Sequence, residues 1–243
     1  MTATPPLVAE SLVRRFDDEL AVDGIDLEVS RGEIHAVVGL NGAGKTTLMR
    51  LLLGMLAPDA GRAVVLGVDA TTAPPELWTE VGHLIETPFA YPELTVEENV
   101  TAAAMLHGLD RSRIGPAVRN TIDELELGRW SRKRSHTLSL GNRQRLGLAS
   151  ALVHRPSIVI LDEPANALDP AGVVFVRDLL QAYAGRDAAV LVSSHHLDLL
   201  ARVAHRITVL HRGRVVGSLE PTEVDLERRF FDLVYEADLK DRS

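Results

Sequence analysis

The segment from Gly39 to Thr46, GLNGAGKT, places glycine, lysine and threonine at the spacing GxxxxGK[ST]. It follows an apolar run with strand character, Ile34 to Val38, and it opens a helical run that starts at Thr47. In this context glycines let backbone N–H groups approach phosphates at the positive end of a helix. Lys45 can reach terminal phosphates as a compact charge, and Thr46 offers a hydroxyl to Mg²⁺. The sequence therefore predicts a nucleotide-binding loop. Its expected ligands are Gly39, Asn41, Gly42, Ala43, Gly44, Lys45, Thr46 and Thr47.

A second set of chemical groups lies where the apolar run Ile158 to Leu161 ends in Asp162 and Glu163. Such a pair by itself mostly marks the end of a strand. Downstream of a phosphate loop, however, Asp162 is placed to hold the Mg²⁺ shell. Glu163 can then orient and deprotonate a water molecule for attack on the γ-phosphate.

The length, charge and cysteine content of the chain exclude several classes of protein. The chain has 243 residues, is 46% hydrophobic, carries a formal net charge of -8 and lacks cysteine. This size suits one domain with an appended lobe, or two small domains. The acidic balance argues against broad nucleic-acid binding, and the lack of cysteine excludes disulfides. The first residues predict no signal peptide, and no apolar run is long enough to span a bilayer.

Hydrophobic periodicity predicts the elements that position these groups. Strands are expected at residues 7–16, 21–29, 34–38, 63–66, 81–85, 158–161, 189–192 and 207–210. Helices are expected at 47–56, 96–107, 114–127 and 140–153, with one more before each of the last two strands. Arg212 and Gly213 predict a hairpin turn. The pattern is an α/β core interrupted by a helical insertion near residues 88–153.

Arginines gather in that insertion. They alternate with acidic residues, so a solvated helical face explains them, and a docking surface for a partner or anionic lipid is the alternative. The arginines are Arg111, Arg113, Arg119, Arg129, Arg132, Arg134, Arg143 and Arg145.

From Gly39 onward the order of motifs resembles the ATP-binding subunit of ABC transporters, over nearly the whole chain. Ser139 to Arg145, with Leu138 before it, is similar to the LSGGQ signature, although Leu140 replaces a glycine and Asn142 the glutamine. The resemblance implies a P-loop NTPase core with an antiparallel β subdomain and a helical insertion lobe in one domain. The core would span about 1–87 and 154–219, the lobe about 88–153 and a helical tail 220–243.

The resemblance also implies roles for single residues. Ser139 and the backbone at Gly141 would cap the γ-phosphate bound by a second subunit, and Asp169 would belong to the loop that links the two ATP sites. His195, rather than its neighbour His196, matches the switch histidine that contacts the γ-phosphate. Phe16 stands where the family places an aromatic ring against adenine.

Glu86 is the most informative departure, because the family has glutamine there. The resemblance implies a catalytic role for this residue, in contact with Mg²⁺ or the attacking water. A carboxylate at this position can coordinate Mg²⁺ directly and adds negative charge beside the phosphates. Together with the altered signature, Glu86 resembles the bacterial branch that exports bacitracin and lantibiotics, often for self-protection, and so confers antibiotic resistance.

The resemblance implies an ATP- and Mg²⁺-dependent ATPase that drives an exporter of drugs or peptide antibiotics. Its partners would be a second ATP-binding subunit, as a homodimer, and an integral-membrane permease. It would lie in the cytoplasm on the inner face of the membrane, without binding nucleic acid. The alternatives are a non-transport ABC ATPase acting on ribosomes or nucleic acid, and a regulator that binds ATP without turnover.

The pattern beyond Gly217 is helical over Pro221 to Val234. Its apolar face predicts either a docked terminal helix or a contact between subunits. The expected face consists of Leu226, Phe230, Phe231 and Val234.

Overall fold

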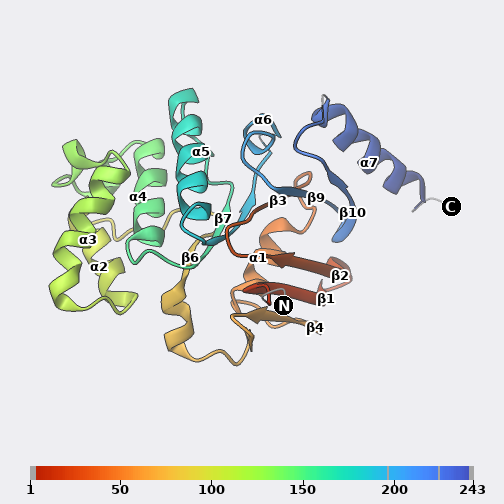
Figure 1. The fold of residues 1–243 in the computed structure, drawn as a ribbon, viewed down its shortest axis with the longest axis horizontal. Helices are drawn as coiled ribbons and strands as arrows, with labels where there is room; N and C mark the ends of the chain where they lie inside the picture. Colours follow the sequence, from red (N-terminus) through yellow and green to blue (C-terminus); the bar gives the residue numbers. More distant parts are fainter. Residues whose placement is uncertain (1–3, 196, 224, 241–243) are drawn as a thin grey trace.

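Two β-sheets form the frame of the molecule in a computed structural model that describes residues 4–195, 197–223 and 225–240 (Figure 1). The first sheet is antiparallel with the order β2-β1-β4-β5. Its strands are β1 (Leu7–Phe16), β2 (Glu19–Val29), β4 (Ala60–Val65) and β5 (Val68–Asp69).

The second sheet has the order β10-β9-β3-β8-β7-β6. All its neighbouring strands are parallel except β10, which forms an antiparallel hairpin with β9. Its strands are β3 (Ile34–Val38), β6 (Val81–Leu84), β7 (Ile158–Asp162), β8 (Ala189–Ser193), β9 (Arg206–His211) and β10 (Arg214–Leu219). In this open parallel arrangement, the carboxyl ends of β3, β7 and β8 meet at one edge, where ligands of α/β folds bind.

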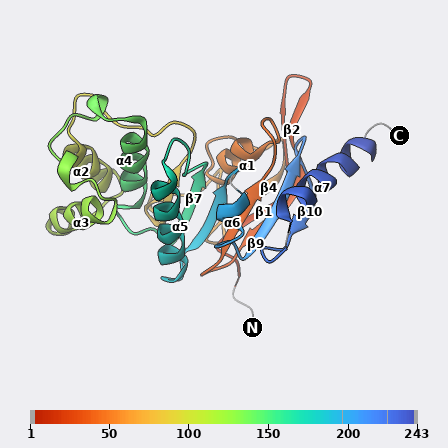
Figure 2. The same cartoon turned by 90° about the horizontal axis from the view of Figure 1, so that it is seen from above.

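The helices lie at both ends of the sheets and over a face of the parallel sheet (Figures 1 and 2). The helices α2, α3 and α4 lie together at one end, α5 and α6 cover a face of the parallel sheet, and α7 lies at the other end beside β10. The α-helices are α1 (Lys45–Leu52), α2 (Val96–Leu106), α3 (Arg111–Glu124), α4 (Leu140–Leu152), α5 (Pro170–Ala184), α6 (Leu197–Leu200) and α7 (Leu226–Lys240). Three short 3-10 turns are η1 (Pro75–Glu80), η2 (Gly128–Trp130) and η3 (Ser135–Thr137).

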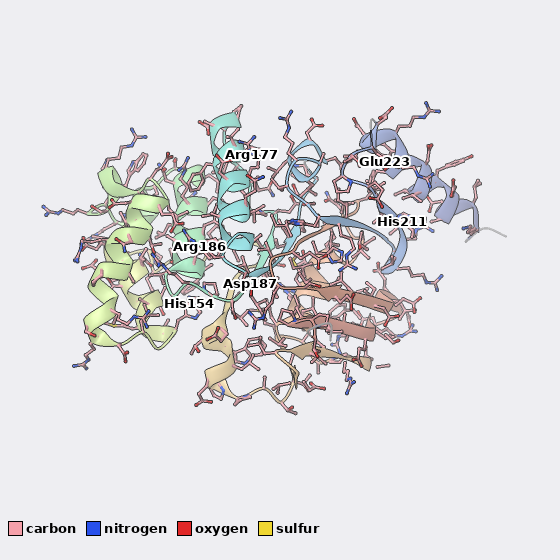
Figure 3. The ribbon with its side chains drawn as sticks, in the orientation of Figure 1. His154, Arg177, Arg186, Asp187, His211 and Glu223 are labelled. Carbon is pink, nitrogen blue, oxygen red and sulfur yellow. The ribbon has the colours of Figure 1, made fainter. Side chains whose placement is uncertain are left out.

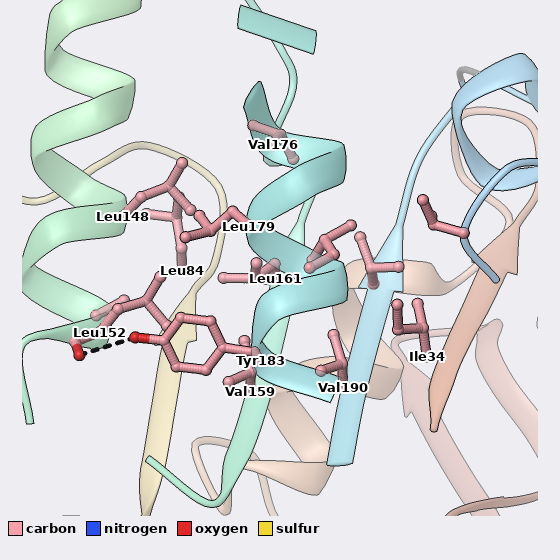
Figure 4. Packing of buried hydrophobic residues seen from close by; sticks show 14 of the residues in the cluster. Ile34, Leu84, Leu148, Leu152, Val159, Leu161, Val176, Leu179, Tyr183 and Val190 are labelled. Carbon is pink, nitrogen blue, oxygen red and sulfur yellow. Dashed lines mark hydrogen bonds between the residues drawn. The ribbon is translucent and has the colours of Figure 1, made fainter. Parts of the chain in front are cut away.

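The buried side chains of β7 belong alternately to two hydrophobic clusters, because successive side chains of a strand point to opposite faces of the sheet. Ile158 and Ile160 belong to the cluster shared with α1 and the antiparallel sheet. Val159 and Leu161 belong to the cluster shared with α5 and the helices α2 to α4, part of which Figure 4 shows. Both faces of this strand are therefore buried, which holds its carboxyl end in place.

Side-chain caps fix two helix starts that matter for the site. Ser139 precedes α4 and its Oγ accepts a bond from the Asn142 N–H at 3.4 Å. Asp169 precedes α5, and its carboxylate accepts from the Gly172 N–H at 2.8 Å. Such caps satisfy backbone donors that a helix leaves open at its N-terminus. The signature and the loop before α5 are thus anchored by their own polar residues.

Several helix ends differ from the periodicity. The helix after the phosphate loop starts at Lys45 and ends at Leu52, short of the expected Leu56. Gly54 closes it in a left-handed conformation (φ +63°), where an added Cβ would lie 2.5 Å from the Ala70 carbonyl oxygen. The helix α3 starts three residues before the apolar pattern, and α7 starts after Pro221 and continues to Lys240.

The helix α7 is docked against β9 and β10. Leu226, Phe230 and Val234 are buried as expected, whereas Phe231 is 51% exposed and lies outside that face. A polar link supports this docking, since His211 Nε2 lies 2.9 Å from Asp238 Oδ1 (His211 is labelled in Figure 3). In the described part of the chain, no helix combines the length and apolar character needed to cross a bilayer.

Candidate nucleotide site

The loop between β3 and α1 has the glycine geometry of a phosphate cradle. Gly42 and Gly44 have φ values of +80° and +101°, a region that other residues rarely adopt. A Cβ at Gly44 would lie 2.3 Å from the Ala21 carbonyl oxygen, and one at Gly39 would lie 2.4 Å from the Leu210 carbonyl oxygen. The backbone there leaves no room for a side chain, so the glycines are required by both sheets.

The ammonium of Lys45 lies inside this loop. Its Nζ donates to the carbonyl oxygens of Gly39 at 2.7 Å and Leu40 at 3.3 Å. A positive charge is thereby held at the centre of the cradle, beside N–H groups at the start of α1. This combination favours a multiply charged anion such as a polyphosphate.

The side-chain oxygens of Thr46 and Asp162 lie together one residue further along α1. The Thr46 hydroxyl donates to Asp162 Oδ2 at 2.6 Å, which joins the loop to the end of β7. The other carboxylate oxygen accepts from the Ser193 hydroxyl at 2.5 Å, and Ser193 Oγ accepts from the Glu163 N–H at 2.9 Å. Asp162 is only 5% exposed and Ser193 is fully buried. Two neighbouring strands thus fix both acidic residues.

Glu163 lies against His195. His195 Nδ1 is 2.8 Å from Glu163 Oε2, and the His195 N–H donates to the same oxygen at 3.3 Å. Glu163 has a positive φ of +50°, a conformation that costs a non-glycine residue free energy. A cavity of about 890 Å³ lies beside these groups, and Gly39, Asn41, Glu163 and His195 help to line it.

The signature residues lie elsewhere. Ser139, Gly141 and Asp169 line a separate cavity of about 760 Å³, and none of the phosphate-loop residues lines it. An added Cβ at Gly141 would be 3.3 Å from the Ala167 carbonyl oxygen, so the start of α4 packs closely on the loop before α5. Leu140, which replaces the family's glycine, turns its side chain outward and is 55% exposed.

Two expected site residues have partners of their own. The Glu86 carboxylate forms an ion pair with Arg50, with Oε1 2.6 Å from Nη2. Phe16 ends β1 with 41% of its surface exposed, and the Arg14 guanidinium lies 4.9 Å from the centre of its ring. An exposed ring at this edge remains available for stacking with a base.

Sequence reasoning missed three residues that support the site. Ser193 holds Asp162 at the end of β7 and Glu163 just after it, and Arg50 pairs with Glu86. Gln144 Nε2 donates to the Pro164 carbonyl oxygen at 3.1 Å, which ties α4 to the segment after Glu163. Serine and arginine on these elements are too common to signal such contacts, and only the strand order brings Ser193 beside Asp162.

A glycine loop between a strand and a helix, with a threonine and a strand-end aspartate beside it, defines a P-loop nucleotide-binding ATPase. A family model described as ABC transporter matches residues 22–166. The chain therefore belongs to the ABC transporter family, as an ATP-binding and ATP-hydrolysing motor subunit.

Comparisons with individual proteins agree with this assignment. The bacitracin transport ATP-binding protein BcrA of Enterococcus faecalis is 35% identical over 221 residues, which cover 90% of this chain and 71% of that protein. The daunorubicin resistance ATP-binding protein DrrA3 of Streptomyces coeruleorubidus is 34% identical over 225 residues, with 93% and 71% covered. The solved structure of cbiO1 from Clostridium perfringens, part of the ABC transporter complex cbiONQ, matches with a TM-score of 0.80 at 27% identity. The match covers 96% of each chain.

Proposed function

We propose that this subunit powers an exporter of drugs or peptide antibiotics and contributes to antibiotic resistance. Relatives named for bacitracin transport and daunorubicin resistance, each about one-third identical to this chain, support the proposal. Glu86 and the altered signature at Leu140 and Asn142 support it as well. The transported molecule itself would be bound by the membrane partner.

We infer that Thr46 and Asp162 hold Mg²⁺ with the nucleotide. A hydroxyl and a carboxylate 2.6 Å apart form the hard oxygen donor set that Mg²⁺ prefers, since this ion usually takes few protein ligands beside phosphate oxygens. When bound, Mg²⁺ would neutralise charge on the transferring phosphoryl group. Lys45 would bind the terminal phosphates through its ammonium and Phe16 would stack on the adenine.

We assign proton transfer to Glu163. Glu163 lines the cavity beside the phosphate loop, and its carboxylate would accept a proton from the attacking water. His195, 2.8 Å away, would orient that carboxylate and contact the γ-phosphate.

The inference that two copies assemble rests on the separation of the signature cavity from the cavity beside the phosphate loop. Ser139 and Gly141 line a cavity separate from the one beside the phosphate loop of their own chain, which supports a γ-phosphate capped by these residues of a second copy. We propose a homodimer with two ATP molecules between facing loops and signatures. Within each chain, residues 88–153 would form a helical lobe, residues 1–87 and 154–219 the core, and residues 220–243 a tail. A permease docked near residues 86–99 would place the dimer at the inner face of the membrane.

The Glu163→Gln variant tests this function. We expect hydrolysis to fall about 10²–10⁴-fold, the usual contribution of a general base, while ATP binding persists. With ATP and Mg²⁺, light scattering should detect a stable dimer of this variant. The Lys45→Ala change in the same background is the control and should abolish the dimer. A Glu163→Gln protein that stays monomeric would rule out the sandwich assembly.

A pull-down from detergent-solubilised membranes of the host tests the transport partner. Recovery of one polytopic membrane protein in a fixed ratio is the expected result. Recovery of ribosomal or DNA-bound proteins, with no polytopic protein, would contradict the transporter assignment and favour a non-transport ATPase.

A further inference from the structure

The start of α7 forms one wall of the cavity beside the phosphate loop. Gly39 and Asn41 line this cavity on the side of the loop, and Phe230 and Phe231 line it from α7. Phe230 is buried, whereas Phe231 is 51% exposed. The two rings form an edge-to-face contact with 5.2 Å between their centroids, which fixes the orientation of Phe231. The cavity therefore presents an exposed aromatic ring that is already held in place.

Negative charge accompanies this ring. Glu227 lines the same cavity and precedes Phe231 by four residues, so the two side chains share one face of α7. In the part of the chain that the structure describes, the Glu227 carboxylate has neither a hydrogen bond nor an ion pair. The same wall also carries Asp198, Glu223 and Asp225. The wall combines an exposed ring with carboxylates, one of which lacks a partner.

The signature helix carries the complementary pair. Leu140 is 55% exposed beside Ser139, and Arg143 follows it by three residues, so Leu140 and Arg143 share one face of α4. Among residues 4–195, 197–223 and 225–240, no group forms a hydrogen bond or an ion pair with the Arg143 guanidinium. An exposed leucine next to a cation thus matches an exposed ring next to a carboxylate, in apolar character and in charge.

These two helix faces cannot meet within one chain. The helix α4 lies in the group of helices at one end of the molecule, and α7 lies at the other end (Figures 1 and 2). In the proposed sandwich, however, the signature of one copy enters the cavity beside the phosphate loop of the other copy. Since α7 is a wall of that cavity, the incoming start of α4 is brought to it.

We propose that the start of α7 is a docking surface for the signature helix of a second copy of this chain. Leu140 of one copy packs on Phe231 of the partner subunit, and Arg143 pairs with Glu227 of the partner subunit. The inference rests on the proposed homodimer. It gives Leu140, which replaces a glycine of the signature, a contact with protein instead of nucleotide. It also explains why Phe231 lies outside the docked face of α7.

An exchange of charges tests the contact without measuring turnover. In the Glu163→Gln background with ATP and Mg²⁺, sedimentation velocity gives the dissociation constant of the dimer. Arg143→Glu alone, or Glu227→Arg alone, places like charges together at both contacts of the dimer, and each should weaken it at least about tenfold. An equimolar mixture of the two variants should regain the parent affinity, because both contacts of the mixed dimer join opposite charges.

The apolar contact has a matched control on the same helix. Phe231→Ala should weaken the dimer about tenfold or more, since the contact occurs twice, and Leu140→Ala should add little to that loss. Tyr235→Ala is the control, because Tyr235 is 64% exposed and lies one turn further along α7. This change should leave the dissociation constant unchanged.

The outcomes separate this inference from the proposed function. A mixture of charge variants no tighter than either variant alone, or equal losses from Phe231→Ala and Tyr235→Ala, would overturn the docking of α4 on α7 while the sandwich dimer stands. Failure of the Glu163→Gln parent to dimerise with ATP would overturn both.

Discussion

Ser193 gives the sharpest test of how the acidic residues are held. Its hydroxyl donates to Asp162 Oδ1 at 2.5 Å and accepts from the Glu163 N–H at 2.9 Å, in a fully buried position. The Ser193→Ala change removes one bond to a charged group, worth about 1.5–3 kcal/mol, and leaves the Glu163 donor with no acceptor. We expect the free energy of unfolding to fall by about 2–4 kcal/mol.

The Ser193→Ala change should also lower the affinity of the site for the metal ion. Partners that orient a ligand typically contribute about 10–100-fold to metal affinity, and Asp162 would lose its partner on β8. Urea unfolding measures the stability, and Mn²⁺ binding with ATP measures the affinity. Ser157→Ala is the control, because Ser157 Oγ is 3.5 Å from the Glu80 carbonyl oxygen in an exposed contact. If Ser193→Ala matched Ser157→Ala in both assays, the inferred support of Asp162 would be refuted.

Two predictions concern stability alone. Burial lowers the pKa of His35 to about 4, whereas an unfolded histidine titrates near about 6.5. The unfolded chain therefore binds the proton first as pH falls, and His35 should cost about 2 kcal/mol of unfolding free energy by about pH 5. The His35→Gln variant should lose less stability than the wild type between about pH 7.5 and pH 5 in urea titrations, and equal losses would contradict the assigned cause. The Tyr183 hydroxyl donates to the Leu152 carbonyl oxygen at 3.2 Å (Figure 4), so Tyr183→Phe should lower Tm by roughly 2–4 °C, and an unchanged Tm in calorimetry would show that this bond adds nothing.

The elements nearest the chemistry were the easiest to predict from sequence. The strand Ile34–Val38 has the bounds that its apolar run predicts, and Asp162 follows another such run directly. Local pattern suffices there, because both strands are buried on both faces and bounded by polar or glycine residues. An antiparallel sheet beside a parallel core sheet is the ABC ATPase fold that the family resemblance implied.

Contacts between distant segments could not be predicted in the same way. Ser193 reaches Asp162 only because β8 and β7 are neighbours, and Arg50 reaches Glu86 only because the segment after β6 passes α1. Helix ends were also missed where a tertiary contact decides them, as at Gly54. The roles of Ser139 and Glu86 remain proposals, since they depend on a second copy and on a bound metal.

The packing of the phosphate loop has a genetic consequence. The Ala21 carbonyl oxygen leaves no room for a Cβ at Gly44, and the Gly213 N–H donates to the Ala43 carbonyl oxygen at 3.0 Å. The strand β2 and the β9–β10 hairpin therefore pack against the loop from outside. An insertion or deletion in either hairpin would displace these atoms and distort the cradle. Loss-of-function alleles should therefore cluster not only in the loop itself but also around residues 21 and 213, which lie outside the loop in sequence and contact its backbone.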